Sequence, residues 1–356
     1  MRDLPPDLPD SVVQAHAHAR ANGLIYVSDA EPGIERQKRG KGFFYLGPDR
    51  KPVTGERTLD RIRKLAIPPA YTQVWICTKD RGHLQATGRD ARRRKQYRYH
   101  AEWRSTRDDG KFSKMIDFGA QLPKLRRRLK QDLLLQGLPK NKVLAVIVTL
   151  LDETLIRVGN EEYARTNQSY GLTTLRDKHV KFLRDGRASF NFRGKSGRHH
   201  EVVLDDRRLA RIIKRCQQLP GQQLFQYIDD EGQRQPIDSG MVNEYLREAM
   251  GGNNDFTAKD FRTWGGTVRA IAFLSCQARH DPMTQRAFNG CVAATARNVA
   301  EALGNTPAVC RKSYINPVVF EAWKAGLVEQ RVPRSSMSPR RMELAALALL
   351  KSQHRA

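Results

Sequence analysis

The sequence predicts an α+β fold in which a small β-rich N-terminal domain, residues 1–103, precedes a larger, mainly helical domain, residues 104–356. Short runs of β-branched and aromatic residues separated by turn residues fill the first part of the chain. Apolar residues at helical spacing dominate the rest, and a three-stranded β meander interrupts them. The 356 residues, 39% of them hydrophobic, are enough for two domains that each bury a core.

The N-terminal domain is predicted to hold three strands and one helix. The strands are expected at Gly23–Val27, Gly42–Leu46 and Thr72–Cys77. The helix runs from Thr58 to Ala66, where Leu59, Ile62 and Leu65 share one face. A segment from Gly88 to His100 then interleaves basic residues with tyrosines, which combines phosphate neutralisation with rings that pack on sugars or bases. A solvated basic strand anchored by its tyrosines is the alternative interpretation.

The larger domain is expected to start with a polar linker, Ser105–Lys114, and a buried helix within Val143–Tyr163. Alternating residues predict the meander strands at His179–Leu183, Ala188–Arg193 and His200–Leu204. The last two strands are joined by a hairpin tip that carries Lys195. Further helices are predicted at Asp206–Leu219, Ser239–Met250, Ala258–Leu274 and Thr284–Leu303.

Helix start and stop signals surround Tyr314. Gly304 is a natural residue to end the helix before it, and Pro307 suits the first turn of a short new helix. Asn316 and Pro317 repeat the start signal directly after the tyrosine. Tyr314 is therefore expected at a break between helices, where its side chain is presented rather than buried.

The formal charge of +25 indicates the class of partner. Such a surface concentrates a polyanion and releases its counterions on binding, so nucleic acid is the first candidate. Basic residues run through the whole chain, which suits a protein that surrounds its partner. A ribosomal protein or a protein bound to anionic membrane is the alternative that charge alone leaves open.

Other sequence features exclude several classes. Five scattered cysteines, without a Cys-x-x-Cys pair, favour neither a disulfide framework nor a zinc site. No apolar stretch is long enough to span a bilayer, and the N-terminus lacks the layout of a secretory signal, so a cytoplasmic protein is expected. The lysine at 195 does not belong to a P-loop, because Ser189 stands where that motif needs its first glycine. The acidic pairs and His199-His200 have no recognised metal-ligand spacing.

Four residues supply the groups needed to cleave a phosphodiester without a metal. A tyrosine such as Tyr314 attacks phosphorus after losing its proton, which cationic surroundings favour. Arg157 and Arg262 offer rigid charged forks matched to the non-bridging oxygens. Lys195, on a hairpin tip, can give a proton to the departing oxygen.

Five ordered blocks of sequence resemble one family. They are Leu155–Tyr163, Gly171–Val180, Gly194–Ser196, Lys259–Trp264 and Ser313–Pro317. Together with Gly82–Asp90 they resemble the bacterial, poxvirus-like type IB DNA topoisomerases, and the resemblance covers about Gly23 to Val319. It implies the catalytic fold shared by tyrosine recombinases and type IB topoisomerases, with two domains that close around duplex DNA as a clamp.

The resemblance also implies roles for single residues. Tyr314 would form a 3′-phosphotyrosyl bond, Arg157 and Arg262 would stabilise the transition state, and Lys195 would act as general acid. Lys259 and Tyr163 would contact phosphates near the cut, and Thr174 would approach the major groove. The N-terminal candidates for DNA contact are Gln85, Arg94, Tyr97 and Tyr99.

The implied reaction relaxes supercoiled DNA through single-strand cleavage, strand swivel and religation. It needs no ATP, metal or other cofactor, because the phosphotyrosyl bond stores the energy for religation. A monomer that acts on double-stranded DNA, associated with the nucleoid and not with a membrane, is expected.

Asn305 departs from the family pattern. Poxvirus enzymes and many relatives carry histidine nine residues before the tyrosine, whereas this chain has asparagine. An asparagine amide donates a hydrogen bond but carries neither charge nor proton. Because one well-placed donor to an oxyanion is worth roughly 3 kcal/mol, Asn305 is still expected to contribute to catalysis.

Two other functions compete with this interpretation. A tyrosine recombinase uses similar residues, but Lys259 stands where recombinases commonly place histidine, and a β-rich region replaces their usual helical N-terminal domain. A non-catalytic basic DNA-packaging protein would bind DNA with strong salt dependence and form no covalent adduct.

Overall fold

The computed structural model describes residues 10–40, 42–91, 93–251, 255–279, 282–332 and 338–354. The chain divides into two compact units, Met1–Lys111 and Phe112–Ala356. The division falls inside helix α3, Ala101–Leu133. The predicted boundary at residues 103 and 104 lies in the same helix. The mixed fold, with a smaller β-sheet unit and a larger helical unit, confirms the predicted α+β class.

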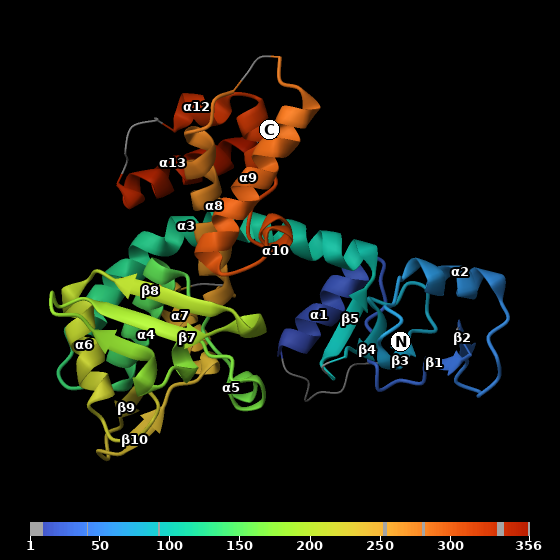
Figure 1. The fold of residues 1–356 in the computed structure, drawn as a ribbon, viewed down its shortest axis with the longest axis horizontal. Helices are drawn as coiled ribbons and strands as arrows, with labels where there is room; N and C mark the ends of the chain where they lie inside the picture. Colours follow the sequence, from blue (N-terminus) through green and yellow to red (C-terminus); the bar gives the residue numbers. More distant parts are fainter. Residues whose placement is uncertain are drawn as a thin grey trace. The chain divides into compact units, whose positions relative to one another are not determined.

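The smaller unit is built on a five-stranded antiparallel sheet with strand order β2-β1-β3-β4-β5 (Figure 1). Its elements are α1 Asp10–Ala21, β1 Ile34–Arg39, β2 Gly42–Leu46, α2 Glu56–Lys64, β3 Thr72–Ile76, β4 Leu84–Arg89 and β5 Lys95–Tyr99. Ile62 of α2 packs on Ile34, Val74 and Ile76 of the sheet. The strand predicted at Gly23–Val27 is wrong: Ile25 makes only an isolated bridge with Gly82.

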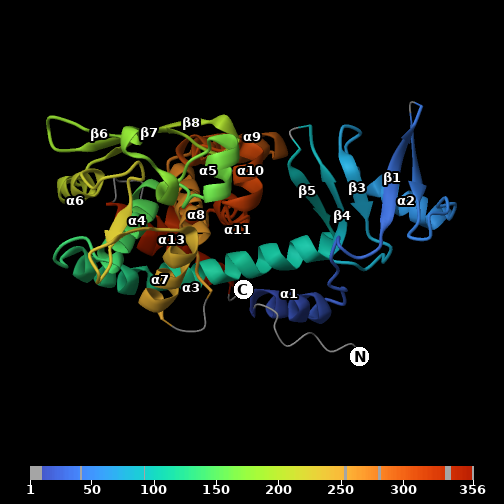
Figure 2. The same ribbon diagram turned by 90° about the horizontal axis from the view of Figure 1, so that it is seen from below.

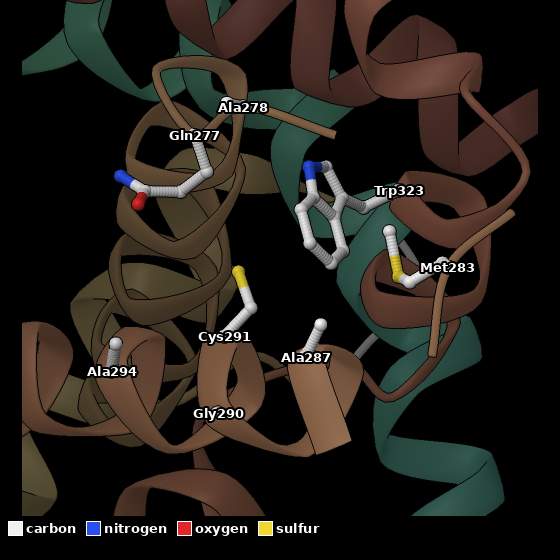
Figure 3. A pocket seen from close by; sticks show the side chains of 8 residues that line it. All are labelled: Gln277, Ala278, Met283, Ala287, Gly290, Cys291, Ala294 and Trp323. Atoms are coloured by element: carbon white, nitrogen blue, oxygen red, sulfur yellow. The ribbon is translucent and has the colours of Figure 1, made fainter. Parts of the chain in front are cut away.

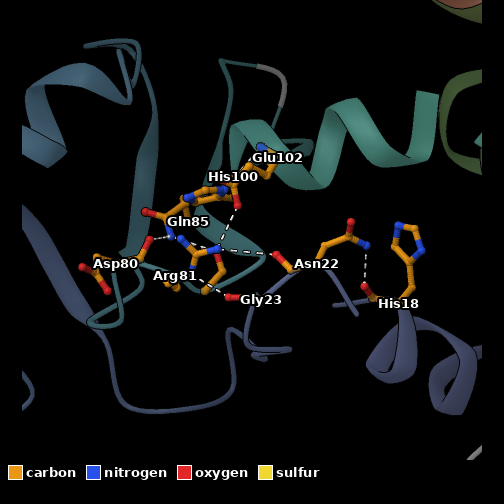
Figure 4. A network of polar contacts seen from close by, with 9 residues as sticks. His18, Asn22, Gly23, Asp80, Arg81, Gln85, His100 and Glu102 are labelled. Atoms are coloured by element: carbon orange, nitrogen blue, oxygen red, sulfur yellow. Dashed lines mark hydrogen bonds and ion pairs between the residues drawn. The ribbon is translucent and has the colours of Figure 1, made fainter. Parts of the chain in front are cut away.

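A polar network ties the loops of this unit together (Figure 4). Arg81 donates from Nε to the Gly23 carbonyl at 2.6 Å and from Nη2 to the Glu102 carboxylate at 2.9 Å. Asn22, beside the end of α1, donates to the His18 carbonyl at 2.8 Å. The network therefore fixes the segment after α1 against the start of α3.

The core of the larger unit is built around helix α4, most of which is buried (Figure 2). Its further helices are α4 Lys140–Thr154, α5 Glu161–Asn167, α6 Arg207–Gln217, α7 Ser239–Met250, α8 Ala258–Ser275, α9 Gln285–Leu303, α10 Pro307–Ser313, α11 Val318–Lys324, α12 Leu327–Arg331 and α13 Pro339–His354. The strands are β6 Val180–Phe182, β7 Ala188–Arg193 and β8 His199–Leu204 in one antiparallel meander, and β9 Gln226–Ile228 and β10 Arg234–Pro236 in a hairpin. The meander and the helices α6 to α9 confirm the predicted elements, with ends that differ by a few residues.

Two sequence expectations for this unit are wrong. The predicted linker at Ser105–Lys114 is helical and belongs to α3. A polar stretch can continue a helix whose neighbouring turns are anchored by buried residues, here Trp103, Met115 and Phe118. The helix expected within Val143–Tyr163 ends at Thr154, because Leu155 takes a left-handed conformation with φ of 56°. That break moves Arg157 from a helix into a loop.

One pocket opens at the end of α8, against α9 and α11 (Figure 3). Its volume is about 260 Å³, and Met283, Cys291 and Trp323 project into it. None of its lining residues is charged, so it lacks the groups that phosphate chemistry needs. Across the described ranges, no helix is long and apolar enough to cross a membrane.

Candidate active site

Tyr314 lies at the break between α10 and α11, as the start and stop signals predicted. Thr306 caps α10 by accepting from the Val309 amide at 3.3 Å. Thr267 of α8 holds the tyrosine segment by donating to the Tyr314 carbonyl at 3.2 Å and accepting from the Asn316 amide at 3.1 Å. The half-buried tyrosine is therefore fixed against α8, the helix that carries Arg262.

Arg262 is held by backbone carbonyls at two helix ends. It is 3% exposed, and it donates from Nη1 to the Leu155 carbonyl and from Nη2 to the Leu303 carbonyl, the latter at 2.8 Å. Leu155 caps α4 and Leu303 ends α9, where carbonyls and the helix dipole favour a cation. The guanidinium carbon lies 5.1 Å from the centre of the Tyr314 ring. Two helix ends thus aim Arg262 at the tyrosine.

Arg157 and Asn305 are linked directly. Arg157 follows the break after α4 and donates from Nη2 to the Asn305 side-chain oxygen. Asn305 follows Gly304, which ends α9 in a left-handed conformation with φ of 58°. The Asn305 amide nitrogen Nδ2 is buried and has no nitrogen or oxygen acceptor among the described residues. This buried amide, which lies near the Cys310 thiol and beside Arg157, is suited to donate to an anionic oxygen.

The electrostatics of this cluster favour a negative charge on the tyrosine. Burial raises the pKa of Tyr314, but the positive charges of Arg262, Arg157 and Lys259 and a hydrogen bond from Arg262 outweigh it, so the pKa lies below the ordinary value. Burial and the charge of Arg262 lower the pKa of Arg157 to about 10, so it remains a cation at neutral pH. Within the described part of the chain, neither arginine pairs with a carboxylate.

Both lysine candidates are exposed, and Lys259 is close enough for its charge to act on Tyr314. Lys195 begins the short turn Lys195–Gly197 between β7 and β8, and its side chain is exposed. Lys259 is exposed in the first turn of α8, where a capping box formed by Thr257 and Asp260 starts the helix as predicted. Its charge is one of those that lower the pKa of Tyr314.

The candidates for DNA contact in the larger unit differ in accessibility. Tyr163 is 58% exposed at the start of α5. Thr174 is only 5% exposed, and its hydroxyl exchanges hydrogen bonds with Gly171, accepting from the amide at 3.0 Å and donating to the carbonyl at 3.1 Å. The Thr174 hydroxyl thus has its hydrogen-bond partners within its own loop.

The N-terminal candidates divide in the same way. Gln85 is 2% exposed; its amide donates to the Asp80 carbonyl at 2.9 Å and its oxygen accepts from Arg61 at 2.6 Å, so it holds a loop rather than facing solvent (Figure 4). Arg94 forms an ion pair with Asp90 at 2.7 Å. Tyr97 is 46% exposed and stacks on Tyr99 with ring centres 6.0 Å apart. The exposed ring of Tyr97 is available on edge strand β5.

Sequence reasoning missed two residues near Asn305. Arg198 donates from Nη1 to the Asn305 carbonyl at 2.6 Å. The ring of His200 packs against Gly304 so closely that a Cβ atom added there would lie 2.3 Å from its Cε1. Both residues follow Lys195 in the same hairpin, and this shared hairpin is the only sequence signal for them. In the ranges that the structure describes, no group of three or more metal-binding side chains is present.

Comparisons with known proteins agree with this geometry. Residues 100–328 match the family described as eukaryotic DNA topoisomerase I, catalytic core, and residues 42–90 match bacterial DNA topoisomerase IB, N-terminal domain. DNA topoisomerase 1B of Acanthamoeba polyphaga mimivirus is 35% identical over 82% of this chain and 88% of its own length. DNA topoisomerase 1B of vaccinia virus, strain Copenhagen, is 23% identical over 71% of this chain and 76% of its own length. The chain belongs to the type IB DNA topoisomerase family.

Proposed function

We propose that Tyr314 is the nucleophile with which this type IB topoisomerase opens and reseals one strand of duplex DNA. The tyrosine loses its proton to solvent, and its oxygen bonds to phosphorus as the bond from phosphorus to the 5′-oxygen breaks. The 5′-oxygen takes a proton from an acid and leaves as a hydroxyl, while the 3′ end stays on Tyr314. The free strand swivels, and the reverse reaction reseals the DNA without ATP or a metal.

One observation carries this proposal. Arg262 lies over the Tyr314 ring, and Arg157, bonded to Asn305, is close enough for its charge to act on the tyrosine. The partners of the two arginines are neutral oxygens rather than carboxylates. The cluster keeps a net positive charge, which both lowers the pKa of Tyr314 and remains free to offset a phosphate. Preorganised cations aimed at the position where charge develops are the largest contribution to this kind of catalysis.

The remaining roles follow from position and chemistry. Arg157 and Arg262 bind the non-bridging oxygens, and the Asn305 amide donates to one of them. Lys195 is the general acid, because a lysine on an exposed turn can approach the leaving 5′-oxygen. Lys259 and Tyr163 contact flanking phosphates, and Arg94, Tyr97 and Tyr99 contact DNA from the smaller unit.

The chain acts as a monomer on double-stranded DNA in the nucleoid. All five proposed catalytic groups come from the larger unit of a single chain, so a second copy is not needed to complete the site. Sedimentation of the purified protein with a short duplex tests this, and a species of two or more chains per duplex at the active concentration would contradict it.

The test of the proposed function is plasmid relaxation. Wild-type protein and Tyr314→Phe are incubated with negatively supercoiled plasmid in EDTA without ATP, and reactions are stopped with denaturant. Wild type is expected to relax the plasmid and to leave protein on the 3′ end, whereas Tyr314→Phe binds DNA and does neither. Salt-sensitive binding without relaxation by wild type would favour a packaging protein, and cleavage confined to paired specific sites would favour a recombinase.

A further inference from the structure

The position of Lys195 depends on the backbone of the turn that carries it. The Lys195 ammonium forms no hydrogen bond or ion pair with any residue that the structure describes. The turn itself is sharp: the residues at 196 and 197 both have positive φ, 64° at Ser196 and 75° at Gly197. An acid placed this way meets its target only if something outside the turn fixes the turn.

Arg198 provides one contact that fixes it. Its backbone carbonyl closes the turn by accepting from the Gly194 amide at 2.7 Å. Its side chain reaches across to the other segment and donates to the Asn305 carbonyl at 2.6 Å. The side-chain oxygen of Asn305 accepts from Arg157, so Arg198 connects the Lys195 turn to the residues around Tyr314.

His200 provides the second contact. A Cβ atom at Gly194 would lie 2.6 Å from its Cδ2, and a Cβ atom at Gly304 would lie 2.3 Å from its Cε1. The ring therefore fills the space between the glycine before Lys195 and the glycine before Asn305. It also stacks on Phe192 with ring centres 5.1 Å apart, which holds it in place.

We propose that Arg198 is a positioning residue for Lys195: it ties the β7–β8 turn to Asn305 and so fixes where the ammonium meets the leaving 5′-oxygen. His200 serves as the spacer that sets the distance between the two segments. This inference rests on the proposed role of Lys195 as the general acid. It differs from a direct role of Arg198 on the phosphate, which would act on the non-bridging oxygens.

A change of leaving group separates these roles. When sulfur replaces the bridging 5′-oxygen at a mapped cleavage site, the strand leaves as a thiolate, because thiols, with pKa about 8.5 for cysteine, are far stronger acids than alcohols. Cleavage of this DNA needs no general acid, but it still needs every group that binds the non-bridging oxygens. Single-turnover cleavage of oxygen and sulfur substrates is measured for each variant.

Lys195→Ala is the reference: it should be about 100-fold slower or more on the oxygen substrate and nearly normal on the sulfur substrate. Arg198→Ala is expected to be about 10- to 100-fold slower on the oxygen substrate, because small misplacement of an acid is costly, and to lose most of that defect with sulfur. Arg198→Lys keeps a donor for the Asn305 carbonyl and should recover part of the rate on the oxygen substrate. Arg187→Ala is the matched control, since it removes the same charge from the residue just before β7, away from the Lys195 turn, where Arg187 pairs with Asp185 at 2.7 Å.

Each result decides between the alternatives. Recovery of Arg198→Ala by sulfur supports the proposal. A defect of equal size on both substrates overturns it and assigns Arg198 to the phosphate, and a normal rate on the oxygen substrate overturns it as well. If sulfur does not rescue Lys195→Ala, the proposed function has failed at its general acid, which is a distinct outcome.

Discussion

Two arginine clusters in the larger unit differ in the partners that hold them. Arg126 of α3 donates to Asp152 of α4 at 2.7 Å and to Glu343 of α13 at 2.6 Å. Its hydrogen bonds to these carboxylates raise the pKa of Arg126, the bonds to Glu343 most strongly. Arg157 and Arg262 instead donate to an amide oxygen and to backbone carbonyls. The charge of Arg126 is therefore neutralised within the protein, whereas the charges of Arg157 and Arg262 are not.

The difference separates a structural arginine from one available to a ligand. Carboxylates cancel the charge of Arg126, so that this ion pair joins three helices and offers nothing to DNA. Neutral oxygens orient Arg157 and Arg262 without cancelling their charge, and that charge acts on Tyr314. In the proposed mechanism it also acts on the incoming phosphate. The group that accepts the hydrogen bonds of the arginine is what distinguishes Arg126 from Arg157 and Arg262.

Removal of Arg262 should have the largest effect on the reaction. Arg262→Ala is expected to slow single-turnover cleavage by about 1,000-fold, because a preorganised charge for the transition state is lost. It should also cost about 1 to 3 kcal/mol of folding stability for each carbonyl left without its donor. Arg269→Ala, on the same helix and bonded to Asn298 at 3.2 Å, is the control and should cleave normally. A cleavage rate for Arg262→Ala close to wild type would remove Arg262 from the site.

Removal of Arg126 should lower the free energy of unfolding and leave the cleavage rate unchanged. Arg126→Met leaves Asp152 and Glu343 without their cation, and we expect a loss of about 3 kcal/mol in the free energy of unfolding at neutral pH. Burial raises the pKa of Asp152, and the charge of Arg126 opposes this rise, so the loss should shrink as the pH falls and Asp152 becomes protonated. Urea unfolding at several pH values measures this. The cleavage rate of the folded fraction should match that of wild type. A lower rate would contradict the assignment of Arg126 as a structural residue.

Replacing Asn305 with aspartate should give Arg157 a carboxylate partner like those of Arg126. Asn305→Asp keeps the shape of the side chain but gives Arg157 an acidic partner. We expect cleavage about 100-fold slower than wild type, because the variant loses both the amide donor and the free charge. Asn305→Ala loses the donor alone and should be less impaired. If Asn305→Ala is as slow as Asn305→Asp, the uncancelled charge of Arg157 is not what matters, and an unchanged rate for Asn305→Ala would exclude Asn305 from catalysis.

The sequence allowed candidate catalytic residues to be proposed because each belongs to a block whose chemistry is local. Tyr314 follows from helix signals on both sides of it, and the meander that presents Lys195 follows from alternation of residues. Contacts between distant segments left no such signal. Arg198 and Asn305 are 107 residues apart, and Arg126 and Glu343 are 217 residues apart.

Burial was the other property that the sequence did not reveal. Gln85 and Thr174 looked like polar residues available to DNA, yet both are buried and form hydrogen bonds within nearby loops, Gln85 also with the Arg61 side chain. Only the fold decides whether a polar side chain in a loop faces solvent or closes the loop. Arg157 showed the opposite case, because a left-handed residue at Leu155 ended the helix that apolar periodicity had extended past it.

The smallest effect is expected from replacing Lys259, the exposed lysine whose charge acts on Tyr314. Lys259→Met removes one of the charges that lower the pKa of Tyr314, so the pKa should rise toward its ordinary value and less phenolate should form at neutral pH. With saturating protein, cleavage should be about threefold slower at neutral pH, since exposed charges contribute well under 1 kcal/mol. The rate should recover as the pH is raised, so the pH profile moves to the alkaline side, whereas Lys214→Met on α6 should leave the profile in place. A reduced rate that stays reduced at high pH would show that Lys259 acts on cleavage through its proposed phosphate contact alone, and the charge that favours the phenolate would then come from Arg157 and Arg262.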